Sequence, residues 1–352
     1  MKPAGAAALA LLAASACGDN IPVDPEFEPW LLEELDAADG VWVRTPEFDV
    51  AAGEEIQDCY FFTIPADQPG DALWVDRMQL ALNPGSHHLN LFRVGELRNL
   101  KPADGAAVDL GGVAGTVIEG GECWKSGNWA NWALVANNQK AQVDDPILDW
   151  ALPAGVATRF SPGETLMLQV HYVNAATQET PFRGRAGANL WRSTDGDTME
   201  MGTLFATQQN IRICRSNPRP TYKGSCAMPT GTHTVAAVNG HFHSRGKTFS
   251  VYAWDGVSST QPPERDLFYR NTNWEEPEMK LGMSLPLPVG GGVWWTCDFQ
   301  WKEPEAGCAV VDQRDPLQAG DCCYTFGPIV EASEHCNVFL YYWPKTSDVN
   351  CF

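Results

Sequence analysis

The chain is built largely from short apolar or alternating runs, each bounded by Gly, Pro, Asn or Asp. The clearest of them are GVWVRTPEFDV, CYFFTIP, ALWVDRMQLAL, LNLFRV, TLMLQVHYVN, GTLFATQ, KTFSVYAWDG, GVWWTCDFQW and NVFLYYW. Runs of this length and spacing are typical of strands in β-sandwiches. Helical spacing is limited to EFEPWLLEELDAADG, which predicts one short helix at most. The sequence therefore predicts an all-β fold.

The length of the chain predicts two domains. Its 352 residues are more than one compact core usually holds, since a domain has roughly 100–200 residues. The polar stretch RSTDGDTMEMG, residues 192–202, separates two strand-rich segments of similar size. We therefore expect one domain over residues 30–196 and a second over residues 197–352.

The N-terminus reads as an export signal. One lysine precedes the small and apolar run AGAAALALLAASAC, which is too short to span a bilayer. Cys17 follows small residues as in a bacterial lipobox, although Ala14 stands where leucine is usual. We expect residues 1–17 to be a lipoprotein signal peptide that ends at a lipidated Cys17, with plain signal cleavage as the alternative. Residues 18–29 are polar, as expected of a flexible tether.

The cysteines agree with an extracytoplasmic location, either on a membrane through the lipid anchor or as a periplasmic or secreted protein. Eleven are present, and removing Cys17 leaves an even number that suits disulfides in an oxidising compartment. A metal–thiolate site at Cys322 and Cys323 is the competing interpretation. Adjacent cysteines lack the usual spacing of a zinc knuckle, so we expect up to five disulfides instead.

Two histidine motifs precede the predicted domain boundary. His87 and His88 follow Pro-Gly at the head of a strand. Neighbours in a regular strand point to opposite faces, so both can reach one metal ion only at a strand end or a bulge. His171, in TLMLQVHYVN, shares a strand face with Gln169 that lies opposite an apolar face.

Two further motifs follow the boundary. His241 and His243 are two residues apart, so on a strand their imidazoles share a face and can bind one ion. His335 stands beside Cys336, just before NVFLYYW. Six of the seven histidines thus lie in four short motifs. Imidazole is a common ligand for copper and zinc, so this concentration predicts a metal site.

The order of these motifs resembles that of the copper type II, ascorbate-dependent monooxygenases, the family of the peptidylglycine α-hydroxylating and dopamine β-monooxygenases. The shared order is His-His, then Gln-Val-His-Tyr, then His-x-His, then Cys-Asn before an aromatic strand, and it spans about Asp58 to Cys351. The resemblance implies two antiparallel β-sandwich domains of jelly-roll type. It also implies one copper site on each domain, both facing an open, solvated cleft.

The resemblance further implies which residues bind each ion. The ligands of the electron-supplying copper would be His87, His88 and His171. Those of the oxygen-binding copper would be His241, His243 and the residue at the position of a family methionine, which here is His335. A third imidazole is harder than a thioether, so we expect it to lower the potential of that copper. The competing interpretation of His335 is a solvated loop residue.

Disulfides and substrate positions also follow from the resemblance. The implied disulfides are Cys297–Cys336, Cys226–Cys351 and Cys59–Cys123, which leave Cys214, Cys308, Cys322 and Cys323 without assigned partners. An arginine that grips the substrate carboxylate in the peptidylglycine branch is replaced here by Asn239, so a peptide C-terminus is a poor candidate substrate. Asn337 and Phe339 are expected nearest the oxygen-binding copper, and Gln169 is expected to position water or substrate. His233 is interpreted as structural or as a support for a ligand.

With this resemblance, the sequence predicts an extracytoplasmic dicopper monooxygenase. Two well-separated copper ions would use O2 and a reductant such as ascorbate to hydroxylate a C–H bond of a small organic substrate. A monomer is expected. The net charge of −20 and the lack of a basic run exclude a nucleic-acid partner. The alternatives are a copper-binding or electron-transfer lipoprotein that has lost oxygenase activity, and a sandwich binding module with incidental histidines.

Overall fold

The structure is a computed structural model. It describes residues 32–67, 70–83, 85–95, 116–118, 132–139, 145–174, 182–194, 198–304, 307–308 and 320–352. Within these ranges it consists mainly of strands and loops, with a short 3₁₀ turn at Glu264–Asp266, and this confirms the all-β prediction. All nine runs singled out in the sequence contain strands. The predicted signal peptide, the tether and Cys17 lie outside the described residues.

The short helix that the spacing of residues 26–40 allows is not formed in its described part. Residues 36–39 form a turn, and the carbonyl oxygens of Leu32 and Glu33 accept hydrogen bonds from the side chains of Arg44 and Asn189 at 3.0 and 2.9 Å. Because these carbonyls are bonded to neighbouring strands, they are not available to a helix. Among the described residues, no helix is long and apolar enough to cross a membrane.

The strands of the first half, together with β13 from just beyond the predicted boundary, form two large sheets and one small one. The first sheet has the spatial order β1 (Gly40–Arg44), β12 (Ala186–Arg192), β4 (Leu73–Leu82), β9 (Val156–Phe160) and β13 (Met199–Glu200), with β8 (Ile147–Ala151) also paired to β4. The second has the order β6 (Thr116–Ile118), β3 (Glu55–Thr63), β10 (Thr165–Val173), β5 (Ser86–Arg93) and β7 (Ala133–Asn138). The small sheet pairs β11 (Phe182–Gly184) with β2 (Phe48–Val50).

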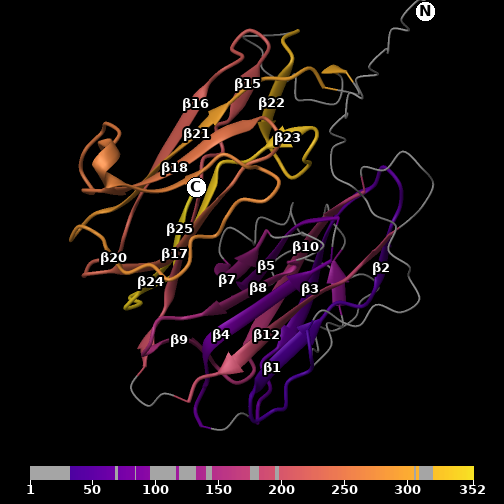
Figure 1. The fold of residues 1–352 in the computed structure, drawn as a ribbon, viewed down its shortest axis with the longest axis vertical. Coiled ribbons are helices and arrows are strands. Elements are labelled where there is room, and N and C mark those ends of the chain that lie inside the picture. Colours follow the sequence, from indigo (N-terminus) through magenta and orange to yellow (C-terminus); the bar gives the residue numbers. More distant parts are fainter. Residues whose placement is uncertain are drawn as a thin grey trace, which may run out of the picture.

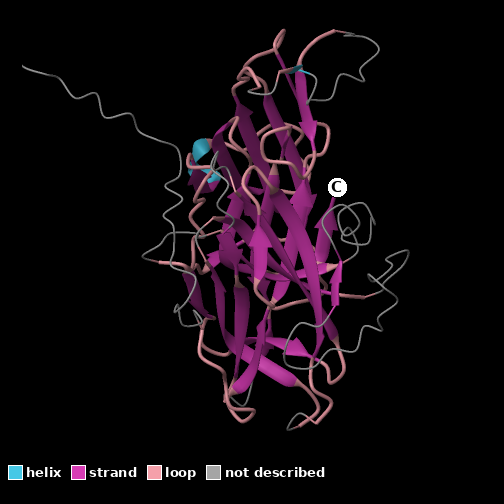
Figure 2. Ribbon diagram, turned by 90° about the vertical axis from the view of Figure 1, so that its right-hand side faces the viewer, coloured by secondary structure: helices cyan, strands magenta, loops and turns pink. Residues whose placement is uncertain are grey.

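The second half contains three sheets. One has the order β20 (Leu285–Pro286), β17 (Thr234–His241), β24 (Asn337–Trp343), β14 (Gly202–Thr207) and β25 (Val349–Cys351). Another has the order β16 (Thr221–Ala227), β21 (Gly292–Phe299), β18 (Gly246–Trp254) and β19 (Leu267–Asn271). The smallest contains β15 (Arg212–Cys214), β22 (Cys323–Phe326) and β23 (Ser333–Glu334). Figure 1 shows the strands of the two halves gathered in separate parts of the molecule, and Figure 2 shows the same strands after a 90° turn.

Apolar packing joins the two halves. One buried cluster contains the inner side chains of the first half and also Phe205, Phe339 and Tyr341 of the second. The rings of Trp150 and Tyr341 meet edge to face at 4.7 Å between centroids. Because a single apolar cluster crosses the predicted boundary, the division at residues 196–197 stays a prediction.

Four disulfides are present among the described cysteines. They are Cys214–Cys323, Cys226–Cys351, Cys297–Cys336 and Cys308–Cys322. Two of them are the pairs expected above, and the other two join the four cysteines left without partners; Cys123 lies outside the described residues. Since Cys322 and Cys323 both belong to disulfides, neither offers a thiolate to a metal. The disulfides suit an oxidising, extracytoplasmic environment.

A single hydroxyl at the junction allows a test of this packing. The Tyr341 hydroxyl donates to Asn137 Oδ1 at 2.9 Å, and both residues are fully buried. Tyr341→Phe should lower the free energy of unfolding in urea by about 1–3 kcal/mol, because Asn137 loses its donor where water cannot replace it. Tyr252→Phe is the control and should cost less, since its partner Gln261 is exposed. An equal loss of unfolding free energy in both variants would show that the buried hydrogen bond at the junction stabilises the fold no more than the exposed one.

Candidate metal centre

A β-bulge places His87 and His88 on the same side of their strand. In the pairing of β5 with β10, His88 lies opposite His171 and Ser86 lies opposite Tyr172, so His87 is an extra residue. An extra residue of this kind bends the strand and redirects its side chain. The bulge is one of the two conditions under which neighbouring histidines can reach one metal ion.

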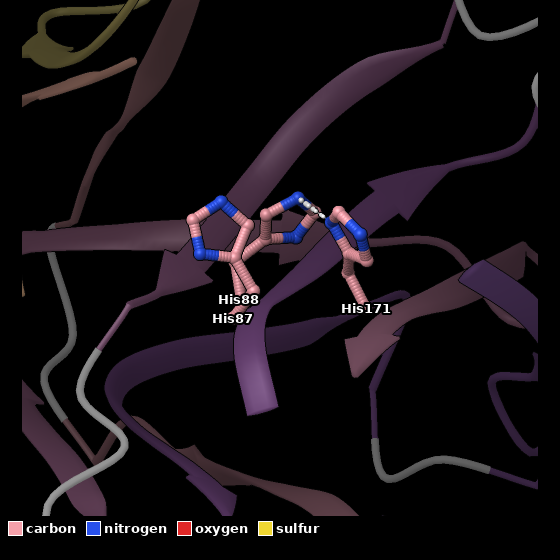
Figure 3. Close-up of side chains that lie close together, drawn as sticks. All are labelled: His87, His88 and His171. Atoms are coloured by element: carbon pink, nitrogen blue, oxygen red, sulfur yellow. Dashed lines mark hydrogen bonds between the residues drawn. The ribbon is translucent and has the colours of Figure 1, made fainter. Parts of the chain in front are cut away.

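His87, His88 and His171 lie side by side (Figure 3). Their ring centroids are 4.9–5.2 Å apart. The Nε2 atom of His88 lies 3.2 Å from Nδ1 of His171. One ligand atom from each of the three lies within 4.8 Å of the others, which is close enough for a shared ion.

Glu55 fixes the orientation of His171. Its Oε1 atom accepts a hydrogen bond from His171 Nε2 at 2.7 Å, which leaves Nδ1 facing His88. The same oxygen accepts from the backbone N–H of Val330 at 2.8 Å. A carboxylate in this position holds a ligating imidazole in one orientation. Glu55 therefore links β3 of the first half to the segment of the second half that leads to His335.

His241 and His243 come from the end of β17. His241 is the last residue of the strand, and His243 follows it by two residues. Phe242, between them, is buried in the core of the second half against Phe249. Its burial turns the two histidines away from that core, toward His335, whose ring centroid lies 5.2 Å from that of His241 and 4.5 Å from that of His243.

A buried ion pair between Glu334 and Arg245 holds the backbone next to these histidines. Glu334, which is fully buried, accepts hydrogen bonds from the backbone N–H groups of His243 and Arg245, both at 2.8 Å. The guanidinium Nε of Arg245 lies 2.9 Å from Glu334 Oε1. Burial raises the pKa of Glu334 to about 7, while Arg245 and the backbone donors oppose that rise. This pair was not predicted from the sequence. Its only sequence signal is that Arg245 lies two residues after His243 and Glu334 directly precedes His335.

Hydrogen bonds also fix which nitrogen each of these histidines presents. His241 donates from Nδ1 to Gln139 Oε1 at 2.9 Å, and His243 donates from Nδ1 to the carbonyl oxygen of Ser333 at 3.0 Å. Their Nε2 atoms therefore carry lone pairs. In the described part of the chain, the Nε2 atoms of His87, His241 and His243 are buried without a hydrogen-bond partner. Gln139 was not anticipated from the sequence.

The two histidine sets meet in one cluster. The ring centroid of His87 lies 4.9 Å from that of His241 and 5.3 Å from that of His243, and His88 lies 5.1 Å from His241. None of the six side chains is more than 7% exposed. The expectation of two well-separated sites on an open, solvated cleft does not hold in this structure. The physical reason is the apolar packing between the halves, which brings the two histidine sets together and buries them.

Burial favours the neutral form of five clustered imidazoles, those of His87, His88, His241, His243 and His335. Desolvation, with a smaller contribution from neighbouring histidines, lowers the pKa values of His87, His88, His241 and His243 well below the usual value for histidine. The same causes lower the pKa of His335 to about 3. A neutral imidazole offers a lone pair to a metal ion, so these side chains need not lose a proton before binding.

A cavity of about 30 Å³ adjoins the cluster. Its lining combines histidines, side-chain amides and phenylalanines, namely His88, His241, His335, Gln57, Asn90, Gln139, Gln169, Asn337, Phe92, Phe205 and Phe339. The volume is enough for about two water molecules. Gln169, Asn337 and Phe339 were expected near the metal, and the structure places all three in this lining.

Two residues singled out in the sequence lie elsewhere. Asn239 is buried on β17 opposite Phe339 of β24, and its amide has no hydrogen-bond partner among the described residues. His233 lies away from the cluster, where its ring nitrogens face the carbonyl oxygens of Pro229 and Pro344 at 3.0 and 3.1 Å. It therefore holds two loops together and contacts none of the other histidines.

Comparisons with known proteins leave the identity open. No protein-family model matches the chain, and no curated protein matches it. Among solved structures, the PBSX exported protein XepA is 9% identical, with 76% of this chain and 89% of that chain covered and a TM-score of 0.23. The infectious bursal disease virus Gx strain structure is 8% identical, with coverages of 88% and 77% and a TM-score of 0.18. Likeness this low supports no argument about fold or function.

The Glu55 carboxylate provides the first test of the site. Glu55→Ala removes the acceptor of His171 Nε2, so copper affinity should fall by about 10- to 100-fold, as for other groups that orient a metal ligand. Glu54→Ala is the matched control, because Glu54 is exposed and its carboxylate accepts only a local bond from Ala51. Competition with a copper chelator measures both variants. Equal affinities would mean that Glu55 does not orient a ligand.

The neutral histidines predict how the metal-free protein responds to pH. Their folded pKa values are depressed, so below about pH 6.5 the unfolded chain binds protons that the folded chain does not. Stability should therefore fall between pH 6.5 and 5, by about 1.4 kcal/mol per pH unit for each fully buried histidine. Glu334, whose pKa is raised, acts in the opposite direction, but it is one group against five. Urea unfolding at several pH values measures this slope.

His335→Gln is the control. It removes one of the buried histidines, so it should reduce the pH dependence of the unfolding free energy by the contribution of one histidine. A free energy of unfolding that stays constant between pH 6.5 and 5 would contradict the neutral cluster.

Proposed function

We propose that the protein is an extracytoplasmic copper oxidoreductase that resembles the copper type II, ascorbate-dependent monooxygenases. In this proposal it hydroxylates a C–H bond of a small organic substrate with O2 and a reductant such as ascorbate. The observation that carries it is the convergence of all six motif histidines on one buried locus. Six imidazoles without a free thiolate form a donor set that suits copper.

The architecture proposed with this function is more specific than an all-β fold. Each half would be a jelly-roll sandwich, with the first over residues 30–196 and the second over residues 197–352. The chain would be a monomer held at a membrane by lipid on Cys17, a proposal that rests on the AASAC sequence.

The residues around the cluster have separable roles in this proposal. Bound copper would supply one-electron transfer and the activation of O2. Gln139 and the Ser333 carbonyl hold the Nδ1 protons of His241 and His243, so that both Nε2 lone pairs face the centre. Glu55 orients His171, and the phenylalanines of the cavity keep bulk water out.

The cavity bears on the substrate class. Apart from the histidines, its polar lining consists of neutral amides. Without a cation, the lining offers no bidentate partner to a carboxylate, so we expect an uncharged substrate. About 30 Å³ accepts O2 but no organic molecule. In this proposal the cavity widens to admit an organic substrate.

The closed cavity also favours a second candidate function. A copper-binding or electron-transfer protein needs no room for an organic substrate. The two functions share the copper ions and differ in oxygen consumption.

Metal analysis and oxygen uptake test both candidates. We expect two copper ions per chain and ascorbate-dependent oxygen uptake. His335→Ala should lower copper retention, whereas His335→Met should raise the reduction potential of one ion because a thioether favours Cu(I). Two copper ions without oxygen uptake would favour electron transfer. No stoichiometric copper would contradict both candidates and indicate a binding module.

A further inference from the structure

His87 stands between the two histidine sets. It comes from the first half, yet its ring lies as close to His241 as to its neighbour His88, with centroid distances of 4.9 and 5.2 Å. One ligand atom each from His87, His241 and His243 lies within 4.8 Å of the other two. Two sites on separate domains would not place a first-half residue in this position.

The state of the ring nitrogens is a second, independent observation. Within the described ranges, the buried histidine Nε2 atoms without a hydrogen-bond partner belong to these same three residues. Leaving a buried polar atom unpaired destabilises a folded protein, so three such atoms on neighbouring rings call for a partner. For His241 and His243, the Nδ1 atom already donates elsewhere, so the unpaired Nε2 atom carries a lone pair. A cation bound by the three rings would give these lone pairs a partner.

We propose that His87 joins His241 and His243 as a ligand of the same metal ion, so that one ion is bound across the two halves. The identity of the ion as copper rests on the proposed function, whereas the ligand set rests on the geometry. The bulge in β5 acquires a specific role, because it turns His87 toward the second half while His88 stays opposite His171. His335 adjoins this site from the side of His243.

Contacts other than the ion already hold the site together. Gln139 of the first half accepts a hydrogen bond from His241 of the second, and Glu55 accepts one from Val330. The apolar cluster that contains Tyr341 also joins the two halves. The ion would therefore enter a site that is largely preformed, and it would stabilise the closed arrangement of the halves by mass action.

The test isolates this ion before removing His87. The double variant His88→Ala/His171→Ala removes two ligands of the first set and should bind one Cu(I). Adding His87→Ala should then lower the Cu(I) affinity, measured by chelator competition, well beyond the ~10- to 100-fold expected for an orienting group. Copper should also no longer raise the unfolding temperature to the extent seen in the double variant. The matched control is His233→Gln on the same background, since His233 is a buried histidine outside the cluster.

An affinity that His87→Ala leaves unchanged would overturn the inference, as would a double variant that folds but binds no copper. If the double variant does not fold, the same comparison applies to the wild type. His87→Ala should then reduce the retention of the ion that His241 and His243 bind, and copper retention equal to that of the wild type would contradict the inference. The proposed function fails separately, because it requires oxygen uptake by the wild type. Copper binding that depends on His87 without oxygen uptake would support this inference and contradict the oxygenase.

Discussion

The packing of the two halves against each other determines where every functional side chain lies. The edge-to-face contact of Trp150 with Tyr341 joins the halves, and Phe205 and Phe339 of the second half, stacked at 5.2 Å, are buried in the same apolar cluster as the core of the first half. The strands that carry the histidines then meet at this junction. The same apolar contacts thus produce the proximity of the imidazoles, their burial and their neutral state. Separation of the halves would change all three together.

Much of the fold and part of the site could be predicted from local sequence. Alternation and turn residues located the strands, and the side-chain period of two residues predicted that His241 and His243 share a face. The requirement for a strand end or bulge at His87 follows from the same geometry. Glu55 and Gln139 could not be predicted in this way, because each meets its histidine across more than 100 residues of chain. The packing of the two halves could not be predicted from local sequence either, since it depends on which side chains of distant strands contact one another.

The burial of uncharged imidazoles explains why the centre depends on hydrogen bonds from residues around it. Several uncharged imidazoles in one dry site tolerate burial better than charged groups do, but their orientation depends on hydrogen bonds. The Glu334 carboxylate, paired with Arg245, accepts hydrogen bonds from backbone N–H groups at the turn after β17, and the Glu55 carboxylate accepts one from His171 on β10. Hydrogen bonds therefore orient several of the rings, while the Nε2 atoms of His87, His241 and His243 are buried without a partner among the described residues. Such an arrangement suits a metal ion whose ligands are set before it binds.

Anomalous X-ray diffraction at the copper edge, from crystals of the copper-loaded protein, tests the central claim most directly. We expect the copper peaks to lie within the six-histidine cluster, with one of them within bonding distance of His87, His241 and His243 together. Copper peaks on two separate surfaces of an open cleft, or no peak near these histidines, would contradict a single buried centre.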